Sequence, residues 1–108
     1  MAGEVDKAET IYIPSIVVGE LYYGAEYSTR VEQNRSNISK LVLSYPVLLV
    51  DENTGKYYGS VKASLRRKGQ PIPENDIWIA AIALQYNLTL VTRDAHFNAI
   101  NELAAIAW

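Results

Sequence analysis

Residues 71–84 read Pro71-Ile72-Pro73-Glu74-Asn75-Asp76-Ile77-Trp78-Ile79-Ala80-Ala81-Ile82-Ala83-Leu84. The segment begins with residues that start a helix and continues with a long apolar run. Asn75 is of a residue type that caps helices, so Asp76 falls on the first turn, where the helix dipole favours a carboxylate. The residues after Asp76 are apolar around the whole circumference, which is typical of a helix buried on nearly all sides. Asp76 is therefore expected at the mouth of the core, either as an ordinary first-turn acid or as one member of an acidic cluster.

Strands and helices are predicted to alternate on both sides of this central helix. The runs Val47-Leu48-Leu49-Val50 and Leu88-Thr89-Leu90-Val91-Thr92 are typical of strands buried on both faces of a parallel sheet. This alternation predicts an α/β fold in three layers, with a central parallel sheet covered by helices on both faces. The other expected elements are a strand at 10–14, a helix at 16–25, a helix between Thr29 and Pro46, a helix from Asp51 to Gly69, a helical turn near Ile100 and a last strand at 105–108.

Composition limits the function classes. A chain of 108 residues with 49% hydrophobic residues fits one domain, and no apolar run reaches the roughly 18 residues of a membrane span. The first residues lack the pattern of a signal peptide, so we expect a soluble protein. The absence of cysteine excludes disulfides, thiol nucleophiles and cysteine-based zinc sites, and it fits a cytoplasmic location. With a net charge of −2, any nucleic acid must be held locally.

Three acids are predicted at the carboxyl edge of the sheet, where chemistry gathers in open α/β folds. Glu20 follows the first strand by little more than a helical turn, Asp76 opens the central helix, and Asp94 follows the strand that ends at Thr92. Three carboxylates at one edge would repel one another unless a cation held them, and hard divalent ions prefer carboxylate oxygens. We therefore predict a magnesium or manganese site, with these carboxylates about 4–8 Å apart.

Each of these residues also has a simpler interpretation. Glu20 is unusual among apolar neighbours, although it is also compatible with a solvent-facing position between two apolar faces. Asp94 is compatible with an ordinary turn or cap, and Thr92 with a strand residue or a hydroxyl that orients a metal-bound water. His96 is expected to be structural or exposed. The basic residues at 66–68 are either a solvated helix end or a phosphate contact.

Three segments together resemble the PIN domain, in particular the VapC-like toxins of toxin–antitoxin pairs. They are Ile13-Pro14-Ser15-Ile16-Val17-Val18-Gly19-Glu20-Leu21-Tyr22-Tyr23-Gly24, Asn75-Asp76-Ile77-Trp78-Ile79-Ala80-Ala81-Ile82-Ala83 and Leu90-Val91-Thr92-Arg93-Asp94-Ala95-His96-Phe97. The resemblance implies an Mg²⁺- or Mn²⁺-dependent endoribonuclease. It also implies that Glu20, Asp76 and Asp94 are the catalytic metal ligands, with Thr92 and Asn75 as supporting polar groups.

The chain departs from the family in its first block, because the family opens with a strand that ends in Asp-x-Asn. Asp6 is no substitute, since it precedes the predicted strand at 10–14 and would lie roughly 16 Å away, at the opposite edge. We therefore expect residues 1–108 to form a single, N-terminally shortened PIN-like domain. The strands at 10–14 and 88–92 would then either pair directly or accept a segment from another copy or from a cleaved piece.

Two classes of function stay open. The first is a ribonuclease toxin, restrained by a small antitoxin that covers the acidic site and an apolar groove near the tyrosines at 22, 23 and 27. The second is a catalytically impaired remnant that acts as a dimerising and antitoxin-binding module. A nucleotide-binding α/β domain is a weaker third interpretation, because no Gly-rich phosphate loop is present. A homodimer is predicted because the central helix has no polar face, and the resemblance implies the same.

Overall fold

The structure, a computed structural model, describes residues 11–107, which fall into two compact units on either side of the Leu48–Leu49 bond. The first unit contains β1 (Ile13–Pro14), α2 (Ser15–Glu26), α3 (Val31–Ser44) and β2 (Val47–Leu48). The second contains α4 (Glu52–Lys68), α5 (Glu74–Gln85), β3 (Leu90–Val91), the 3-10 helix η1 (Ala95–Ala99) and β4 (Ala105–Ile106). Among residues 11–107, no helix combines the length and apolar composition that a membrane span needs.

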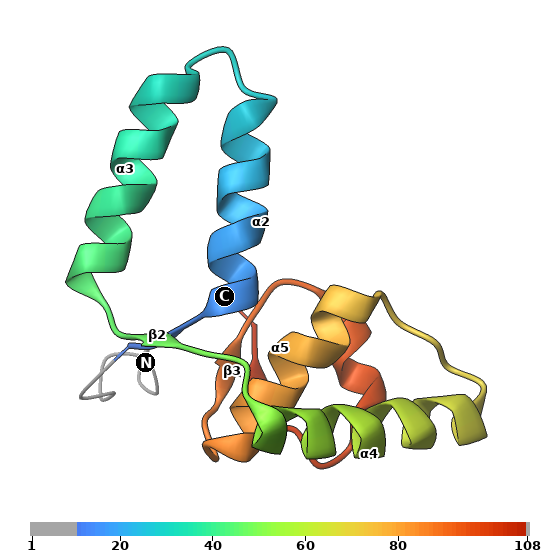
Figure 1. The fold of residues 1–108 in the computed structure, drawn as a ribbon. Helices are drawn as coiled ribbons and strands as arrows, with labels where there is room; N and C mark the ends of the chain where they lie inside the picture. Colours follow the sequence, from blue (N-terminus) through green and yellow to red (C-terminus); the bar gives the residue numbers. More distant parts are fainter. Residues whose placement is uncertain (1–10, 108) are drawn as a thin grey trace. The chain divides into compact units, whose positions relative to one another are not determined.

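The first unit is a helical hairpin that rises from a short parallel strand pair (Figure 1). Ile13 of β1 lies opposite Val47 of β2. Arg35 of α3 joins the two helices by pairing with Glu26 of α2, and it also lies 3.0 Å from Glu32 on its own helix. These ion pairs are exposed, so they contribute little to stability.

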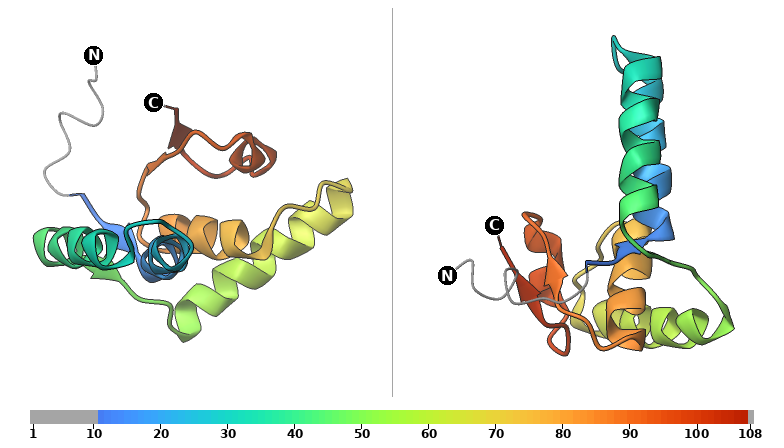
Figure 2. Two further views of the ribbon diagram at one scale, coloured as in Figure 1. Left: turned by 90° about the horizontal axis from the view of Figure 1, so that it is seen from above. Right: turned by 90° about the vertical axis from the view of Figure 1, so that its left-hand side faces the viewer.

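The second unit is built on the contact between α4 and α5. Val61 and Leu65 of α4 are each 2% exposed. Residues on several sides of α5 are also buried: Ile77, Ile79, Ala80, Ala81, Ile82 and Ala83. The prediction of a central helix buried on nearly all sides is therefore confirmed. Figure 2 shows the chain after α5 turning back so that η1 and β4 lie along one side of that helix.

Both ends of α4 follow from its sequence. Asp51 accepts a hydrogen bond from the Thr54 N–H, and the Thr54 hydroxyl accepts one from the Asp51 N–H, so the two residues form a capping box. At the other end Gly69 adopts a left-handed conformation with φ of 66°, which glycine tolerates best. The predicted start at Asp51 and end at Gly69 are both confirmed.

The start of α5 differs from the prediction. Pro73, not Asn75, is the N-cap, and its carbonyl accepts hydrogen bonds from the N–H groups of Asp76 and Ile77. Pro73 has the fixed φ of proline and an extended ψ of 145°, so the helix begins directly after it. Asn75 therefore lies inside the first turn, and Asp76 becomes the third helical residue.

The α/β class with parallel strands is confirmed, but the described residues form two two-stranded sheets in place of one central sheet. β1 pairs with β2, and β3 pairs with β4, with Leu90 opposite Ala105. Prolines 14 and 46 limit the first pair, because they have no N–H to donate to a longer ladder. The prediction that both apolar runs are buried on two faces is wrong: Leu49 is 65% exposed and Val91 41%. Asp6, Thr10 and Trp108, which entered the predictions above, lie outside the described residues.

Candidate metal centre

Asp76 is held at the N-terminal end of α5. Its backbone N–H donates to the Pro73 carbonyl at 3.1 Å, which fixes the residue in the first helical turn. The side chain is 14% exposed, so it lies partly inside the second unit with its carboxylate near the surface. This placement combines the positive end of the helix dipole with access for a ligand from solvent.

Asp94 is held by a tight turn after β3. Its backbone N–H donates to the Thr92 hydroxyl at 3.0 Å, and its Oδ1 accepts the His96 N–H at 2.9 Å. The side chain thus caps the 3-10 helix η1, as the simpler interpretation of Asp94 expected. The Thr92 hydroxyl thus holds the backbone of Asp94 in this turn.

His96 joins the two carboxylates. Its Nδ1 lies 3.0 Å from Oδ2 of Asp76 and 3.0 Å from Oδ1 of Asp94. Hydrogen bonding to Asp76 raises the pKa of His96 above its ordinary value, and the nearby charge of Asp94 acts in the same direction. A protonated imidazole would offset part of the negative charge of the two carboxylates, and it must lose its proton before Nδ1 can bind a metal ion.

The same three side chains meet the spacing that a divalent cation needs. One ligand atom from each lies within 4.8 Å of the others. Neighbouring ligands of an octahedral ion with bonds of about 2.1 Å are roughly 3 Å apart, which matches the two His96 distances. Two carboxylate oxygens and one imidazole nitrogen form a donor set suited to Mn²⁺ and, through the carboxylates, to Mg²⁺. The group therefore fits a divalent metal.

His96 is the site residue that sequence reasoning missed. The sequence predicts a structural or exposed histidine here, and the side chain of His96 is half exposed, but its ring also reaches both acids. The available signal was its position two residues after Asp94 in a tight turn, because such spacing turns both side chains toward one side.

The other predicted site residues lie as follows. Asn75 is exposed on the first turn of α5, and Glu20 is exposed near the middle of α2, in the first unit. The structure thus brings together Asp76 and Asp94 of the second unit, while the approach of Glu20 to them stays a prediction.

The family of the chain follows from its sequence comparisons. The family profile of the PIN domain matches residues 2–103. The chain belongs to the PIN-domain family. This PIN domain is 36% identical over 103 residues to "Ribonuclease VapC2" of Rickettsia felis, a match that covers 94% of the chain and 77% of that protein. It is 33% identical over 97 residues to the "tRNA(fMet)-specific endonuclease VapC" of Shigella flexneri, covering 89% of the chain and 74% of the relative.

A solved structure from the same group of proteins is similar to the chain as well. The structure of VapBC-1 from nontypeable Haemophilus influenzae matches the PIN domain with a TM-score of 0.89 at 32% identity. That match covers 99% of the chain and 83% of the solved chain. The fold and the family therefore rest on independent comparisons of sequence and structure.

Proposed function

We propose that this protein is a metal-dependent endoribonuclease, the toxin component of a toxin–antitoxin pair. One observation carries the proposal: in a member of the PIN family, ligand atoms of Asp76, Asp94 and His96 converge to within 4.8 Å. Relatives named as VapC ribonucleases supply the substrate class, which is RNA.

We assign the site residues the following roles. Asp76 and Asp94 would hold Mg²⁺ or Mn²⁺, and Glu20 is proposed as a further acidic ligand. The chemistry that such an ion supplies is activation of water and neutralisation of charge at the scissile phosphate. Thr92 positions Asp94 through the hydrogen bond to its backbone N–H. We assign Asn75 a supporting role at the surface of the metal site, since it is exposed and lies next to Asp76 on the first turn of α5.

An antitoxin is the proposed protein partner, because the similar structure from Haemophilus influenzae is of a VapBC complex. The first unit offers an apolar surface for it on α2 and the turn that follows. Tyr23 is 66% exposed and Tyr27 79%, and their rings meet edge to face with centroids 5.0 Å apart. Large exposed aromatic side chains of this kind are typical of protein interfaces. We also propose a cytoplasmic location. Both units are proposed to form a single PIN domain, because the family match spans both of them.

We also propose a homodimer. The central helix is buried within the chain, so the surface available for a second copy is formed by the exposed apolar residues of the first unit. Leu43 of α3 is one of these exposed apolar residues, with 85% of its surface accessible. Sedimentation should show a dimer at tens of micromolar protein, and a monomer there would refute this part.

The activity is tested by RNA cleavage with purified full-length chain. Wild type should cut single-stranded RNA with Mg²⁺ or Mn²⁺ and lose activity with EDTA. Asp76→Asn and Asp94→Asn should lose at least about a hundredfold, because a missing metal ligand removes the main charge-stabilising group. Glu102→Gln is the matched control, since Glu102 is an exposed acid outside the cluster.

Two results would decide against the enzyme. Equal activity in wild type and Asp76→Asn would place the cutting site elsewhere. A wild-type chain that binds an antitoxin but does not cut RNA with either metal would favour the alternative function, a catalytically impaired antitoxin-binding module.

A further inference from the structure

A pocket lies beside the acidic cluster in the second unit. It is open to solvent, has a volume of about 450 Å³, and is bordered by the end of α4, the connection that follows it, and the η1 region. This volume falls within the range of about 300–1,000 Å³ that is typical of small-ligand sites. The pocket is therefore large enough for a single nucleotide.

His96 connects this pocket to the carboxylates. It lines the pocket, and its Nδ1 lies 3.0 Å from Oδ2 of Asp76 and 3.0 Å from Oδ1 of Asp94. A molecule in the pocket would thus lie next to the ligand atoms of the candidate metal centre. His96 is thus the residue that the pocket and the acidic cluster share.

The walls offer three kinds of contact. Lys68 brings a positive charge, and the amides of Asn98 and Asn101 bring donors and acceptors. Pro71 and Ile72 form an apolar wall. None of the described residues that line the pocket is acidic. A cation, amides and an apolar wall match the phosphate, the polar edge and the flat face of one RNA nucleotide.

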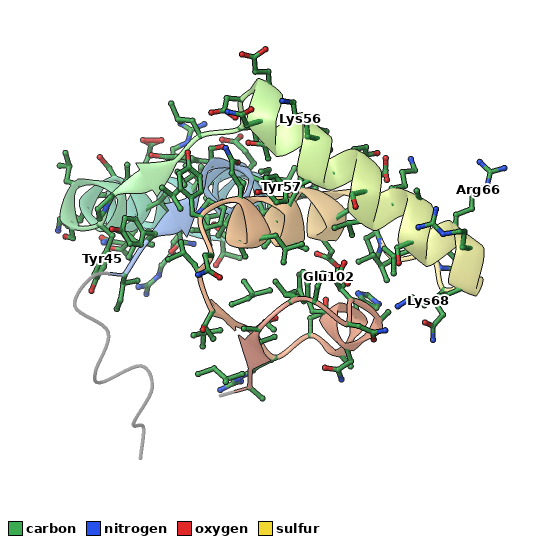
Figure 3. The ribbon with its side chains drawn as sticks, turned by 90° about the horizontal axis from the view of Figure 1, so that it is seen from below. Tyr45, Lys56, Tyr57, Arg66, Lys68 and Glu102 are labelled. Atoms are coloured by element: carbon green, nitrogen blue, oxygen red, sulfur yellow. The ribbon has the colours of Figure 1, made fainter. Side chains whose placement is uncertain are left out.

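The orientation of Lys68 supports this assignment. Its amino group donates to the carbonyl of Ala99, which brings the charge across from α4 to η1. Figure 3 shows Lys68 reaching toward that segment, whereas Arg66 on the same helix end points away from it. An ammonium group has three donors, so the bond to Ala99 leaves two for a phosphate.

We propose that this pocket binds one nucleotide of single-stranded RNA adjacent to the phosphate that is cut. In this arrangement Lys68 contacts a phosphate oxygen, and Asn98 and Asn101 contact the polar edge of the base. The inference rests on the proposed ribonuclease function, which it deepens by locating the substrate.

Two measurements test the pocket on the full-length chain with EDTA present, so that RNA is bound but not cut. The first is the affinity for a short single-stranded RNA of randomised sequence. Lys68→Ala should weaken binding by about tenfold, the effect of losing one charge-assisted hydrogen bond. Arg66→Ala, which removes the same charge from the same helix end, should weaken it less than about twofold, and Lys68→Arg should restore most of the affinity.

The second measurement is photocrosslinking with thiouridine in the same RNA. Crosslinked peptides should map to residues 68–72 and 95–101, and Asn98→Ala should reduce their yield. Equal losses from Lys68→Ala and Arg66→Ala, or crosslinks confined to other segments, would overturn the pocket assignment. If wild type still cuts RNA in that case, the proposed function stands without this subsite. If wild type neither binds nor cuts RNA, the proposed function fails and the subsite fails with it.

Discussion

At the scale of single residues, the second unit brings two carboxylates and one imidazole close together. Asp76 is fixed by a helix start and Asp94 by a turn that caps a 3-10 helix. His96 lies beside Asp94 because it follows that residue by two positions, and the contact between η1 and α5 brings both residues to Asp76. The candidate centre therefore depends on a local turn and on the packing of η1 against α5.

The coupling between His96 and Asp76 gives a prediction for pH dependence. Because hydrogen bonding to Asp76 is the main cause of the raised pKa of His96, Asp76→Asn should lower that pKa toward its ordinary value. In wild type, this pair stabilises the fold below the pKa that histidine has in the unfolded chain. That stabilisation is lost as pH rises through the higher folded pKa.

The measurement is an NMR titration of the His96 ring in metal-free protein. Since this is the only histidine of the chain, its signals need no assignment by mutation. Glu102→Gln should leave the titration unchanged. An unshifted His96 titration in Asp76→Asn would contradict the hydrogen bond as the cause.

Asp51, Thr54 and Gln85 give a second prediction at this scale, because they tie the start of α4 to the end of α5. Thr54 is fully buried, and its hydroxyl donates to the side-chain carbonyl of Gln85, whose amide donates to Asp51 at 3.1 Å. Thr54→Val keeps the volume but removes the hydroxyl that accepts from the Asp51 N–H and donates to Gln85. It should lower the free energy of unfolding by about 1 kcal/mol, the net effect of losing these hydrogen bonds.

Urea denaturation monitored by circular dichroism measures this change. Thr89→Val is the matched control, since Thr89 is exposed, and it should change stability by less than about 0.5 kcal/mol. Equal effects of the two variants would show that the network contributes nothing beyond the general cost of the substitution.

At the scale of secondary-structure elements, the α4–α5 pair is the core of the second unit. Ile82 is 1% exposed and lies on the face of α5 that is fully buried. Ile82→Ala should therefore lower the free energy of unfolding by about 2–5 kcal/mol, whereas Ile82→Val should cost about 0.5–1.5 kcal/mol. Differential scanning calorimetry of both variants checks this order, and a loss below about 1 kcal/mol for Ile82→Ala would contradict the assigned burial.

At the scale of the whole molecule, periodicity predicted the element types better than their boundaries. The all-apolar stretch after Asp76 identified the buried helix, because no amphipathic pattern competes with it there. Asn75 misled the prediction of the helix start, since Pro73 supplies the capping carbonyl through its backbone, which composition does not reveal. The apolar runs around Leu49 and Val91 predicted longer buried strands than form, because run length alone does not report pairing.

The candidate centre was predictable only in part. The edge rule for open α/β folds indicated Asp76 and Asp94, which the structure brings together. The same rule gave no reason to add His96, whose role depends on the turn after Thr92. Neither the pocket beside it nor the orientation of Lys68 has a sequence signal, since both depend on how α4 meets η1.

Metal binding to Asp76 and Asp94 is the central claim, and a thermal-shift titration with Mn²⁺ tests it most directly. Mn²⁺ that binds only the native state should raise the melting temperature of the wild type. At a free Mn²⁺ concentration of one hundred times the dissociation constant, the native state gains about 2.7 kcal/mol. The rise should vanish in Asp76→Asn and Asp94→Asn, shrink in Glu20→Gln, and persist in Glu102→Gln. An undiminished rise in Asp76→Asn and Asp94→Asn would contradict the assigned site.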